Sequence, residues 1–476
     1  MAETLSQALR DLAASRGDEP ALIGAELTYS WAALDDAVDR AAVVLKDEGV
    51  RQGQLVGLVI PRTPALAISF LAIVRLGAVV VPINHKLKTK WIEAQLEGLS
   101  AVVVDPALPH QALFEVPPIS SVSLLEAPAA ADMTEWPADA DTVCYLNCTS
   151  GSTGRPKRAI TTHGQIMANA RATVQVSGQG AGDVFWCLFA SFAHPHECFH
   201  RCLVSGAAFV MVDTMSPRVV SRLVTRHGVS HMLLLPGFAE LWLDAGISPE
   251  SQTTLRLVEA GGSIVTPDLH ARMSAAIRGS FLAVWGSTET SGVALSSSGN
   301  GGSILPGYCI RVVDEGGRSV GSGDIGELCL SGPAVVSGYS AEPTGGSTPF
   351  IDGWFHTGDL VRQDEAGRVH FLGRKSNLLK VSGARVFPAE IEQVLLEHPS
   401  VREVIVVGLP DRRRGEVPVA VVVGTDDHAT SPSALKAHCR ERLAVYKVPR
   451  RIDCWDVLPR LPSGKVDRQA VLDRLS

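Results

Sequence analysis

The sequence lacks an excess of positive charge. Its 476 residues carry 43 Lys and Arg against 50 Asp and Glu, which gives a net charge of −7 at pH 7. A chain this acidic has no general attraction for nucleic acid, so no nucleic-acid partner is expected. Charged residues make up only 20% and apolar residues 46%, a balance typical of globular proteins that bury a core.

The sequence also lacks a long unbroken apolar run. Its most apolar stretch, residues 65–83, is interrupted by Arg75, Gly77 and Pro82, so a buried helix followed by a buried strand is predicted there and no membrane span. The opening MAETLSQALRDL has no basic region followed by an apolar core, as a signal peptide would have. Nine scattered cysteines favour reduced thiols over a disulfide framework. We therefore expect a cytoplasmic protein.

A chain of this length exceeds one ordinary core, so two or more domains are expected. One early helix is predicted after Ser30, with Leu34, Val38, Ala41 and Leu45 on one face and Gly49 at its end. Short runs of β-branched residues, apolar on both faces, then alternate with helical stretches, as in a parallel sheet covered on both sides. The expected strands lie within residues 55–60, 77–83, 101–105, 207–213, 231–236, 255–262 and 281–289.

The predicted fold is therefore α/β: a large N-terminal domain of several subdomains with parallel βα sheets, residues 1–373, and a small mobile α+β domain, residues 374–476. In the small domain, two strand-like runs, 402–411 and 417–423, accompany one predicted helix, Ser433 to Ala444. The Pro-, Ala- and Ser-rich span 106–140 is expected to be a surface connection.

The most distinctive short stretch is CTSGSTGRPKR, residues 148–158. Small residues let backbone N–H groups approach an anion, hydroxyls add donors, and Lys157 adds a positive charge, which together suit a polyphosphate. The spacing is not that of the common nucleotide-binding loop, because Pro156 stands where its second glycine would be. Taken alone, the stretch would be interpreted as a flexible surface loop.

Five further motifs follow in order. After TSGSTGRPK at 149–157 come WGSTET at 285–290, GELCLSGPAVVSGY at 326–339, HTGDL at 356–360, GRKSNLLKVSGARVFPAEIE at 373–392 and LPSGKVDR at 461–468. Together they resemble the adenylate-forming superfamily of acyl-CoA synthetases, carrier-protein adenylation domains and luciferases, and most of all a stand-alone acyl-CoA ligase. The resemblance implies that a carboxylate attacks the α-phosphate of ATP to give acyl-AMP and pyrophosphate, and that the acyl group then passes to a thiol. ATP, Mg²⁺ and coenzyme A are the implied cofactor and substrates.

The resemblance also implies residue roles in adenylation. Glu289 would bind Mg²⁺, Thr288 would touch the α-phosphate, and Lys465 would bridge the carboxylate and α-phosphate oxygens once the small domain closes. The β- and γ-phosphates would be held by Thr149, Ser150, Gly151, Ser152, Thr153, Gly154 and Lys157. The rest of the nucleotide would be bound by Trp285 and Gly286 at adenine, Gly261 and Gly262 at adenine and the acyl group, and Asp359 and Arg374 at the ribose.

For the thiol-transfer step, the resemblance points to the small domain. Its hinge, near residues 374–376, is followed by the implied coenzyme A and thiolation residues Lys380, Ser382, Gly383 and Arg385. The run RRR at 412–414 favours a solvated turn, the usual interpretation of a charge run. The sharper hypothesis is that Arg412 and Arg413 contact phosphates of coenzyme A or an acidic carrier protein.

The stretch HPHECFHRC, residues 194–202, carries metal-ligand residue types at alternating positions. On a strand they would share a face and zinc would be an option, but Pro195 and the pattern that follows favour a helix, where residues two apart point to opposite sides. By resemblance, His194 or His196 lines the acyl pocket, with Pro236 and Gly262. The surrounding FASFAH and LLLPGFAELW are apolar and partly aromatic, which indicates a hydrophobic or aryl acid.

Three residues depart from the family pattern: Arg158 where Gly is common, Trp285 where Tyr is common, and Ser376 where Asp or Lys is common. Alternatives therefore stay open beside the full coenzyme A ligase. The protein could load a separate acyl carrier protein, perform only the thioester half-reaction from a supplied acyl-AMP, or bind an acyl-adenylate without catalysis. The complete set of cationic and Mg²⁺-binding residues argues against the last. A monomer or homodimer is expected.

Overall fold

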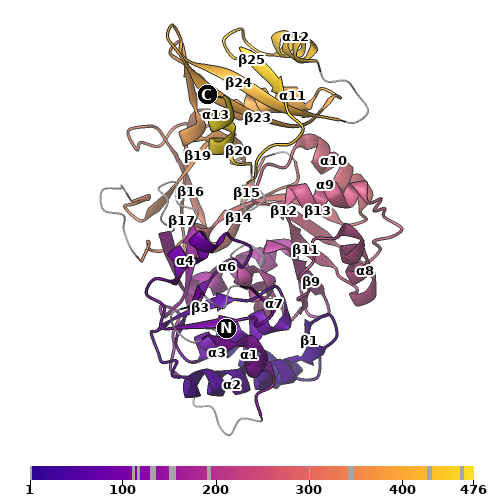
Figure 1. The fold of residues 1–476 in the computed structure, drawn as a ribbon, viewed down its shortest axis with the longest axis vertical. Helices are drawn as coiled ribbons and strands as arrows, with labels where there is room; N and C mark the ends of the chain where they lie inside the picture. The colour runs from indigo at the N-terminus through magenta and orange to yellow at the C-terminus, as the bar shows by residue number, and fades with distance from the viewer. Residues whose placement is uncertain are drawn as a thin grey trace. The chain divides into compact units, whose positions relative to one another are not determined.

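A computed structural model describes residues 3–109, 113–114, 118–128, 136–149, 157–189, 194–299, 301–340, 348–425, 431–460 and 466–475. The chain divides into two compact units. The first comprises residues 1–309 and 330–355, and the second residues 310–329 and 356–476. The hinge expected at 374–376 lies inside the second unit, and the boundary there stays a prediction. The mixed α/β architecture with parallel sheets confirms the predicted fold class (Figure 1).

The first unit contains two sheets. The smaller has the order β6-β5-β3-β4-β7-β8, and β3 is parallel to both β4 and β5, which confirms the strands expected there. Its strands are β3 (Leu55–Val59), β4 (Val79–Pro82), β5 (Ala101–Val104), β6 (Ile119–Ser120), β7 (Val143–Thr149) and β8 (Lys157–Thr162). Nearby helices are α1 (Leu5–Arg16), α2 (Trp31–Asp47), α3 (Pro64–Arg75), α4 (Thr89–Leu96), α5 (Ser121–Leu125) and α6 (His163–Ser177).

The predicted early helix is confirmed as α2. Ser30 caps it, its hydroxyl accepting a hydrogen bond from the Ala33 N–H at 3.2 Å, and the four predicted core residues are all fully buried. The expectation that residues 106–140 form only a surface connection is wrong for part of the span. Ile119 is buried where β6 extends the sheet parallel to β5, and Leu124 of α5 is buried directly after it.

The larger sheet has the order β15-β14-β13-β12-β11-β9-β10-β1-β2, and the run from β13 to β1 is parallel. Its strands are β1 (Pro20–Ile23), β2 (Thr28–Ser30), β9 (Val184–Cys187), β10 (Ala208–Val210), β11 (His231–Leu234), β12 (Leu257–Gly261), β13 (Ser280–Ser287), β14 (Gly292–Ser297) and β15 (Ser303–Ile304). Three helices, α8 (Pro217–His227), α9 (Pro236–Asp244) and α10 (Pro267–Ala276), pack their apolar residues into one core with it. The short α7 (His200–Ser205) precedes β10.

The second unit is built mainly of antiparallel strands. One sheet, of order β16-β17-β19-β18 with β20 beside β19, contains β16 (Cys309–Val313), β17 (Ile325–Ser331), β19 (Trp354–Gln363) and β20 (Val369–Arg374). Its short strand β18 (Phe350–Ile351) comes from the segment 330–355, which is assigned to the first unit. The other, β22-β21-β24-β23 with β25 beside β24, contains β21 (Leu379–Val381), β22 (Ala384–Val386), β23 (Val401–Asp411), β24 (Gly415–Gly424) and β25 (Arg451–Cys454).

The helices of the second unit are α11 (Pro388–Leu396), α12 (Pro432–Arg442) and α13 (Arg468–Leu475). The prediction of one helix at 433–444 found α12 and missed the other two. Both are short and amphipathic: Ile391 and Leu395 of α11 are buried four residues apart, as are Val471 and Leu475 of α13. That spacing is the helical signal that sequence reasoning could have used.

An ion cluster joins the first three helices. Arg75 at the end of α3 is buried, with its guanidinium 2.6 Å from Asp35 and 2.8 Å from Asp39, both on α2, and 3.0 Å from the Ser6 hydroxyl on α1. Arg10 of α1 contacts the same two carboxylates at 2.6 and 2.8 Å. Because each charge is paired and hydrogen-bonded, removal of one partner would leave the others poorly compensated in a largely buried site.

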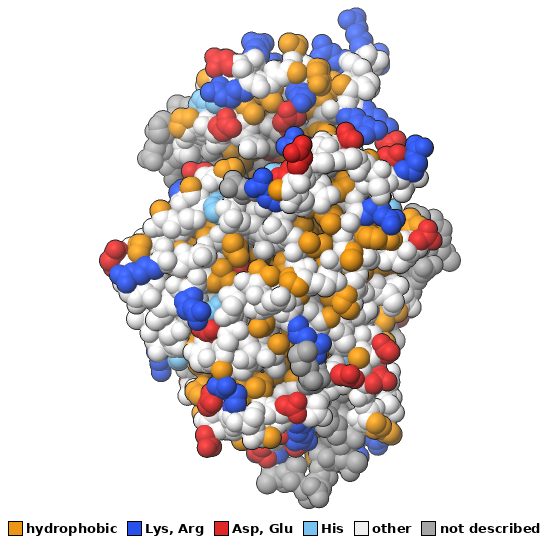
Figure 2. Space-filling model, turned by 180° about the vertical axis from the view of Figure 1, so that it is seen from behind, with side chains coloured by type: hydrophobic (Ala, Val, Ile, Leu, Met, Phe, Trp, Pro, Cys, Tyr) orange, Lys and Arg blue, Asp and Glu red, His pale blue; other side chains and the backbone are white. Residues whose placement is uncertain are grey.

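Within the described ranges, no helix is both long and apolar enough to cross a bilayer. Figure 2 shows Lys and Arg side chains interspersed with Asp and Glu on the face it presents, with hydrophobic side chains scattered between them. Mixed charge of this kind gives no extended field of one sign on that face.

The buried cluster predicts that replacing Arg75 lowers the free energy of unfolding much more than replacing Arg40 does. Arg75→Met should lower the free energy of unfolding by about 3–5 kcal/mol, because it leaves Asp35 and Asp39 with less compensation in a buried site. Arg40→Met, which removes an exposed pair with Asp36 on the same helix α2, should cost less than about 1 kcal/mol. Urea denaturation of both variants measures the difference, and equal losses would contradict it.

Candidate functional site

The turn that carries Glu289 follows the end of β13. A 3₁₀ turn, η4 (Thr288–Thr290), begins where β13 ends, and the Thr290 hydroxyl donates to the Gly292 carbonyl at 2.7 Å to close it. Gly286 is required there, because an added Cβ would lie 2.3 Å from the Gly292 carbonyl oxygen. The Glu289 Oε1 atom accepts a hydrogen bond from the Tyr339 hydroxyl at 2.7 Å. Trp285 lies partly exposed on β13 just before the turn.

The predicted phosphate loop connects β7 to β8. Ser150, Gly151, Ser152, Thr153 and Gly154 lie outside the described residues, but the two ends of the loop are described. Thr149 ends β7 and pairs antiparallel with Lys157, which begins β8. The Lys157 ammonium lies 5.2 Å from the centroid of the Tyr339 ring. The loop lysine and Glu289 therefore both contact Tyr339, a residue that sequence reasoning quoted in a motif without giving it a role.

Arg158 has a structural explanation. Its guanidinium donates to the carbonyl oxygens of Gln95 and Glu97, at 2.8 and 2.9 Å, at the end of α4. The last carbonyls of a helix have no partner within the helix, and a cation beside them is favourable. Arg158 thus anchors the start of β8 to α4.

The residues expected near adenine and the acyl group lie after parallel strands. Gly261 ends β12, and a Cβ there would come 2.7 Å from the Val284 carbonyl oxygen, so only glycine fits. Gly262 has φ +85°, beside Leu235 and Phe189. Pro236 is the buried first residue of α9. Ligands of open α/β sheets bind beyond the carboxyl ends of the strands, where these residues are found.

The histidine-rich stretch folds as predicted into helical turns, η3 (Pro195–Cys198) and α7, leading to β10. His194 is partly exposed, with Nδ1 3.0 Å from the amide nitrogen of Asn147, whereas His196 is buried with Nε2 3.2 Å from the Ser291 carbonyl. In the part of the chain that the structure describes, no three His, Cys, Asp or Glu side chains are placed to hold a metal ion. Which histidine contacts an acid stays a prediction.

Three ionisable side chains are buried beside these histidines. Arg201 pairs with Glu259 of β12, and Glu197 lies close to Gly292, directly after the Glu289 turn. Burial raises the pKa of Glu197 to about 7, against the attraction of Arg201. Burial lowers the pKa of His196 to about 4, so its ring is neutral at pH 7. Sequence patterns gave no signal for this cluster, because charged residues are normally exposed.

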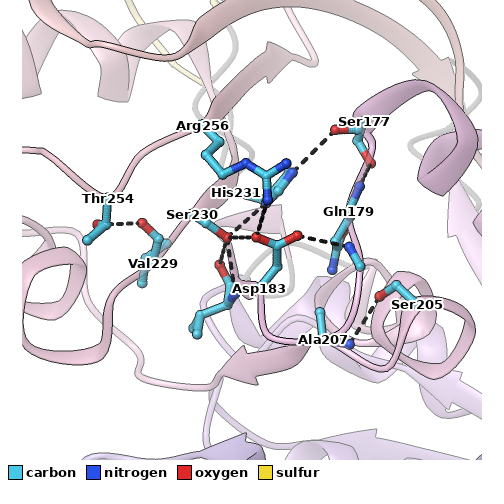
Figure 3. A network of polar contacts seen from close by, with 12 residues as sticks. Ser177, Gln179, Asp183, Ser205, Ala207, Val229, Ser230, His231, Thr254 and Arg256 are labelled. Atoms are coloured by element: carbon cyan, nitrogen blue, oxygen red, sulfur yellow. Dashed lines mark hydrogen bonds and ion pairs between the residues drawn. The ribbon is translucent and has the colours of Figure 1, made fainter.

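A second polar network, shown in Figure 3, contains serine, histidine and aspartate but is not placed for catalysis. The Ser230 hydroxyl donates to Asp183 at 2.9 Å, and Arg256 contacts the same carboxylate at 2.8 Å. His231 Nε2 lies 3.3 Å from the Ser177 carbonyl, and Ser230 is buried. These residues stand at the amino ends of β9, β11 and β12, opposite the candidate site, and they join the strands.

In the second unit, Asp359 and Arg374 face each other. Asp359 is buried on β19, 2.8 Å from the Arg374 guanidinium at the end of β20, and Arg374 also donates to the Thr357 carbonyl at 2.8 Å. Lys375 contacts Glu327 of β17 at 2.9 Å, and the Gly358 N–H donates to the same carboxylate at 3.1 Å. Glu327 therefore holds the backbone of β19 directly before Asp359, a contact that sequence reasoning missed.

The residues expected to act in thiol transfer lie on two adjacent hairpins. Lys380, Ser382, Gly383 and Arg385 are on β21, β22 and their turn, and Arg412 and Arg413 are exposed on the turn between β23 and β24. The hairpins are joined where the Ser382 N–H donates to the Arg414 carbonyl at 2.7 Å. Arg385 contacts Glu315 at 2.6 Å. Lys465 lies outside the described residues.

Comparison with known proteins agrees with the motifs. The sequence model of the family described as AMP-binding enzyme matches residues 9–340, and that of the AMP-binding enzyme C-terminal domain matches residues 390–465. The chain is 33% identical over 467 residues to a feruloyl-CoA synthase from Amycolatopsis sp, covering 93% of each chain. It is 29% identical to the fatty acid–[acyl-carrier-protein] ligase ScoC from Streptomyces coeruleorubidus, covering 99% of this chain and 96% of that protein.

The fold is also similar to that of solved CoA synthetases. The o-succinylbenzoate CoA synthetase MenE from Bacillus subtilis, in complex with its acyl-adenylate intermediate, matches with a TM-score of 0.88 at 27% identity, covering 98% of this chain and 97% of that chain. The same enzyme in complex with ATP and a magnesium ion matches with a TM-score of 0.88 at 26% identity, covering 98% and 99%.

The buried carboxyl group of Glu197 predicts a pH dependence. The folded protein keeps this group protonated up to about pH 7, whereas the unfolded chain releases the proton near the ordinary value of 4.5, so this group makes folding less favourable as pH rises between the two. Glu197→Gln removes that cost. Relative to wild type, its free energy of unfolding should rise from pH 4.5 to 7 by about 1–3 kcal/mol and then level off.

Urea titrations across pH 4.5–8.5 measure this difference. Glu93→Gln, at an exposed position of α4, is the control and should follow the wild-type curve. A Glu197→Gln variant whose difference from wild type does not change with pH would contradict the buried protonated acid.

Proposed function

The chain belongs to the family of AMP-binding enzymes, and from that premise we propose that it joins a hydrophobic or aryl carboxylic acid to coenzyme A in two steps. In the first, a carboxylate oxygen attacks the α-phosphorus of ATP and pyrophosphate leaves, giving acyl-AMP. In the second, the thiol attacks the acyl carbon and AMP leaves. The observation that best supports the proposal is that the Lys157 ammonium and the Glu289 carboxylate both contact Tyr339 in the first unit.

The residues at Glu289 fit a magnesium ion. Mg²⁺ takes oxygen ligands and is commonly held by one or two carboxylates together with substrate phosphates. Glu289 is a partly exposed carboxylate, and no described residue donates a hydrogen bond to its second oxygen, Oε2. When bound, the ion would offset the charge of the triphosphate.

The chain's own residues would then divide the remaining work. Lys157 and the loop before it would hold the β- and γ-phosphates, and Thr288 the α-phosphate. Asp359, a buried carboxylate already oriented by Arg374, would accept hydrogen bonds from the ribose hydroxyls. Lys465 would stabilise the negative charge that develops between the acid and the α-phosphate. Electrostatic stabilisation of the transition state is the largest contribution to catalysis in many enzymes.

The acid is proposed from the composition of the predicted pocket and from relatives. Phe189 and Leu235 beside Gly262 offer an apolar surface. A feruloyl-CoA synthase and a 4-coumarate–CoA ligase from Oryza sativa are among the similar proteins, and both names describe aryl acids. The hydrophobic or aryl class therefore has two independent supports.

Coenzyme A is the proposed acceptor, and its phosphates would meet the exposed cations of the two hairpins, Lys380, Arg385, Arg412 and Arg413. A second candidate is a separate acyl carrier protein, which the similarity to the carrier-protein ligase favours. Both acceptors present a thiol on a phosphopantetheine arm, so the first step is common to them.

Lys465→Ala should separate the two steps. We expect acyl-AMP formation to fall by about a hundredfold or more, because a charge-stabilising group of the transition state is lost, while transfer from preformed acyl-AMP to coenzyme A is retained. Pyrophosphate release and thioester formation measure the two steps. Lys436→Ala, a lysine of α12 outside every predicted role, is the control. An equal fall in both steps of a folded Lys465→Ala variant would remove the assigned role.

Mass spectrometry of thioester products from a pooled acid library tests the function itself. Acids are supplied free with Mg-ATP or as preformed acyl-adenylates, each with coenzyme A or a carrier protein. We expect coenzyme A thioesters from free aryl acids. If thioesters form only from preformed adenylates, the protein catalyses only the second half-reaction. If thioesters form only on the carrier protein, the carrier protein and not coenzyme A is the acceptor.

A further inference from the structure

The Tyr339 hydroxyl contacts the carboxylate to which the proposed function assigns the metal ion. It donates to Glu289 Oε1 at 2.7 Å, and no described residue donates to Oε2. We propose that Tyr339 is a positioning residue, whose hydroxyl holds one oxygen of Glu289 so that the other is directed at the divalent cation. This inference rests on the proposed function and adds to it a residue that does not itself touch the metal.

The backbone of Tyr339 is fixed independently of its side chain. The residue forms an antiparallel bridge with Ala159 of β8, and its two neighbours complete the pairing: Ile160 N–H donates to the Gly338 carbonyl at 3.0 Å, and Ser340 N–H to the Arg158 carbonyl at 2.8 Å. The Val336 N–H donates to the Glu289 carbonyl at 2.9 Å. The phenol therefore extends from a segment whose backbone is paired with β8, and it contacts a turn that is hydrogen-bonded to the same segment.

The phenol can only donate in this pair. The Tyr339 hydroxyl is the donor and the Glu289 Oε1 atom is the acceptor, because a carboxylate oxygen has no proton to give in this pair. A hydrogen bond to an ionised carboxylate is among the stronger ones in proteins and is directional. The contact thus selects one orientation of a side chain that would otherwise rotate about its terminal bond.

The ring also contacts the loop lysine. The Lys157 ammonium lies 5.2 Å from the ring centroid, within the range of a cation–π contact. One side chain therefore contacts both the proposed metal ligand and the proposed phosphate-binding cation. Replacing tyrosine by phenylalanine keeps the ring and removes only the hydroxyl, so the two contacts can be tested separately.

The experiment compares Tyr339→Phe with Tyr308→Phe. Tyr308 is the matched control, because its buried hydroxyl donates to the Thr290 carbonyl at 2.7 Å in the same turn without touching the Glu289 carboxylate. Electron paramagnetic resonance of Mn²⁺, a substitute for Mg²⁺, measures metal binding to each protein in the presence of a non-hydrolysable ATP analogue. Thermal melting monitors folding, and transfer from preformed acyl-AMP to coenzyme A is measured beside it.

We expect Tyr339→Phe to weaken Mn²⁺ binding by about tenfold, in line with the loss of a hydrogen bond to a charged group. Transfer from preformed acyl-AMP should be unchanged, and Tyr308→Phe should lower the melting temperature but bind Mn²⁺ as wild type does. Unchanged or tighter Mn²⁺ binding by Tyr339→Phe would overturn the inference, as would equal weakening in both variants. Wild-type protein that fails to bind Mn²⁺ with nucleotide would instead overturn the proposed function.

Discussion

The pairing of residues 338–340 with strand β8 is the constraint on which the candidate site depends. Two backbone hydrogen bonds make that pairing, and three further bonds fix the segment before it: Gln165 to the Val335 carbonyl at 3.1 Å, Ser291 to the Ala334 carbonyl at 2.8 Å, and Val336 N–H to the Glu289 carbonyl at 2.9 Å. The side chains of Gln165 and Ser291 donate two of these bonds, and none of the five involves the side chain of Lys157, Glu289 or Tyr339. Lys157, Glu289 and Tyr339, far apart in the chain, meet because of them.

Sequence reasoning succeeded where a pattern is local. The helix after Ser30 and the strands at 55–60 and 255–262 follow from capping, spacing and apolar runs, each of which is decided within about ten residues. It was incomplete for α11 and α13, which are short, and for β6, a two-residue strand whose existence depends on the neighbouring β5. The contact of Tyr339 with Glu289 joins residues 50 apart in sequence, and no local pattern contains it.

The stretch 194–202 shows the limit of reasoning from residue types. Its alternating histidines and cysteines suggest a metal site, but Pro195 begins a 3₁₀ turn and the side chains then point in different directions. His196 reaches the Ser291 carbonyl, Glu197 lies beside Gly292, and Arg201 pairs with Glu259. His196 and Glu197 are thus buried against residues 291 and 292, which directly follow the Glu289 turn. A charged residue in the core is recognised only when its partner from another strand is known.

The first strand of the chain pairs with a strand that lies far downstream. Leu22 of β1 is opposite Phe209 of β10, a separation of 187 residues (209 − 22), and Ala21 and Leu22 are fully buried in the finished sheet. During synthesis on the ribosome, the hairpin of β1 and β2 is therefore made early but must wait for nearly two hundred more residues before its apolar side chains are covered. β1 therefore completes its pairing only after β10 has been translated, and over that interval it offers an exposed strand edge to molecular chaperones.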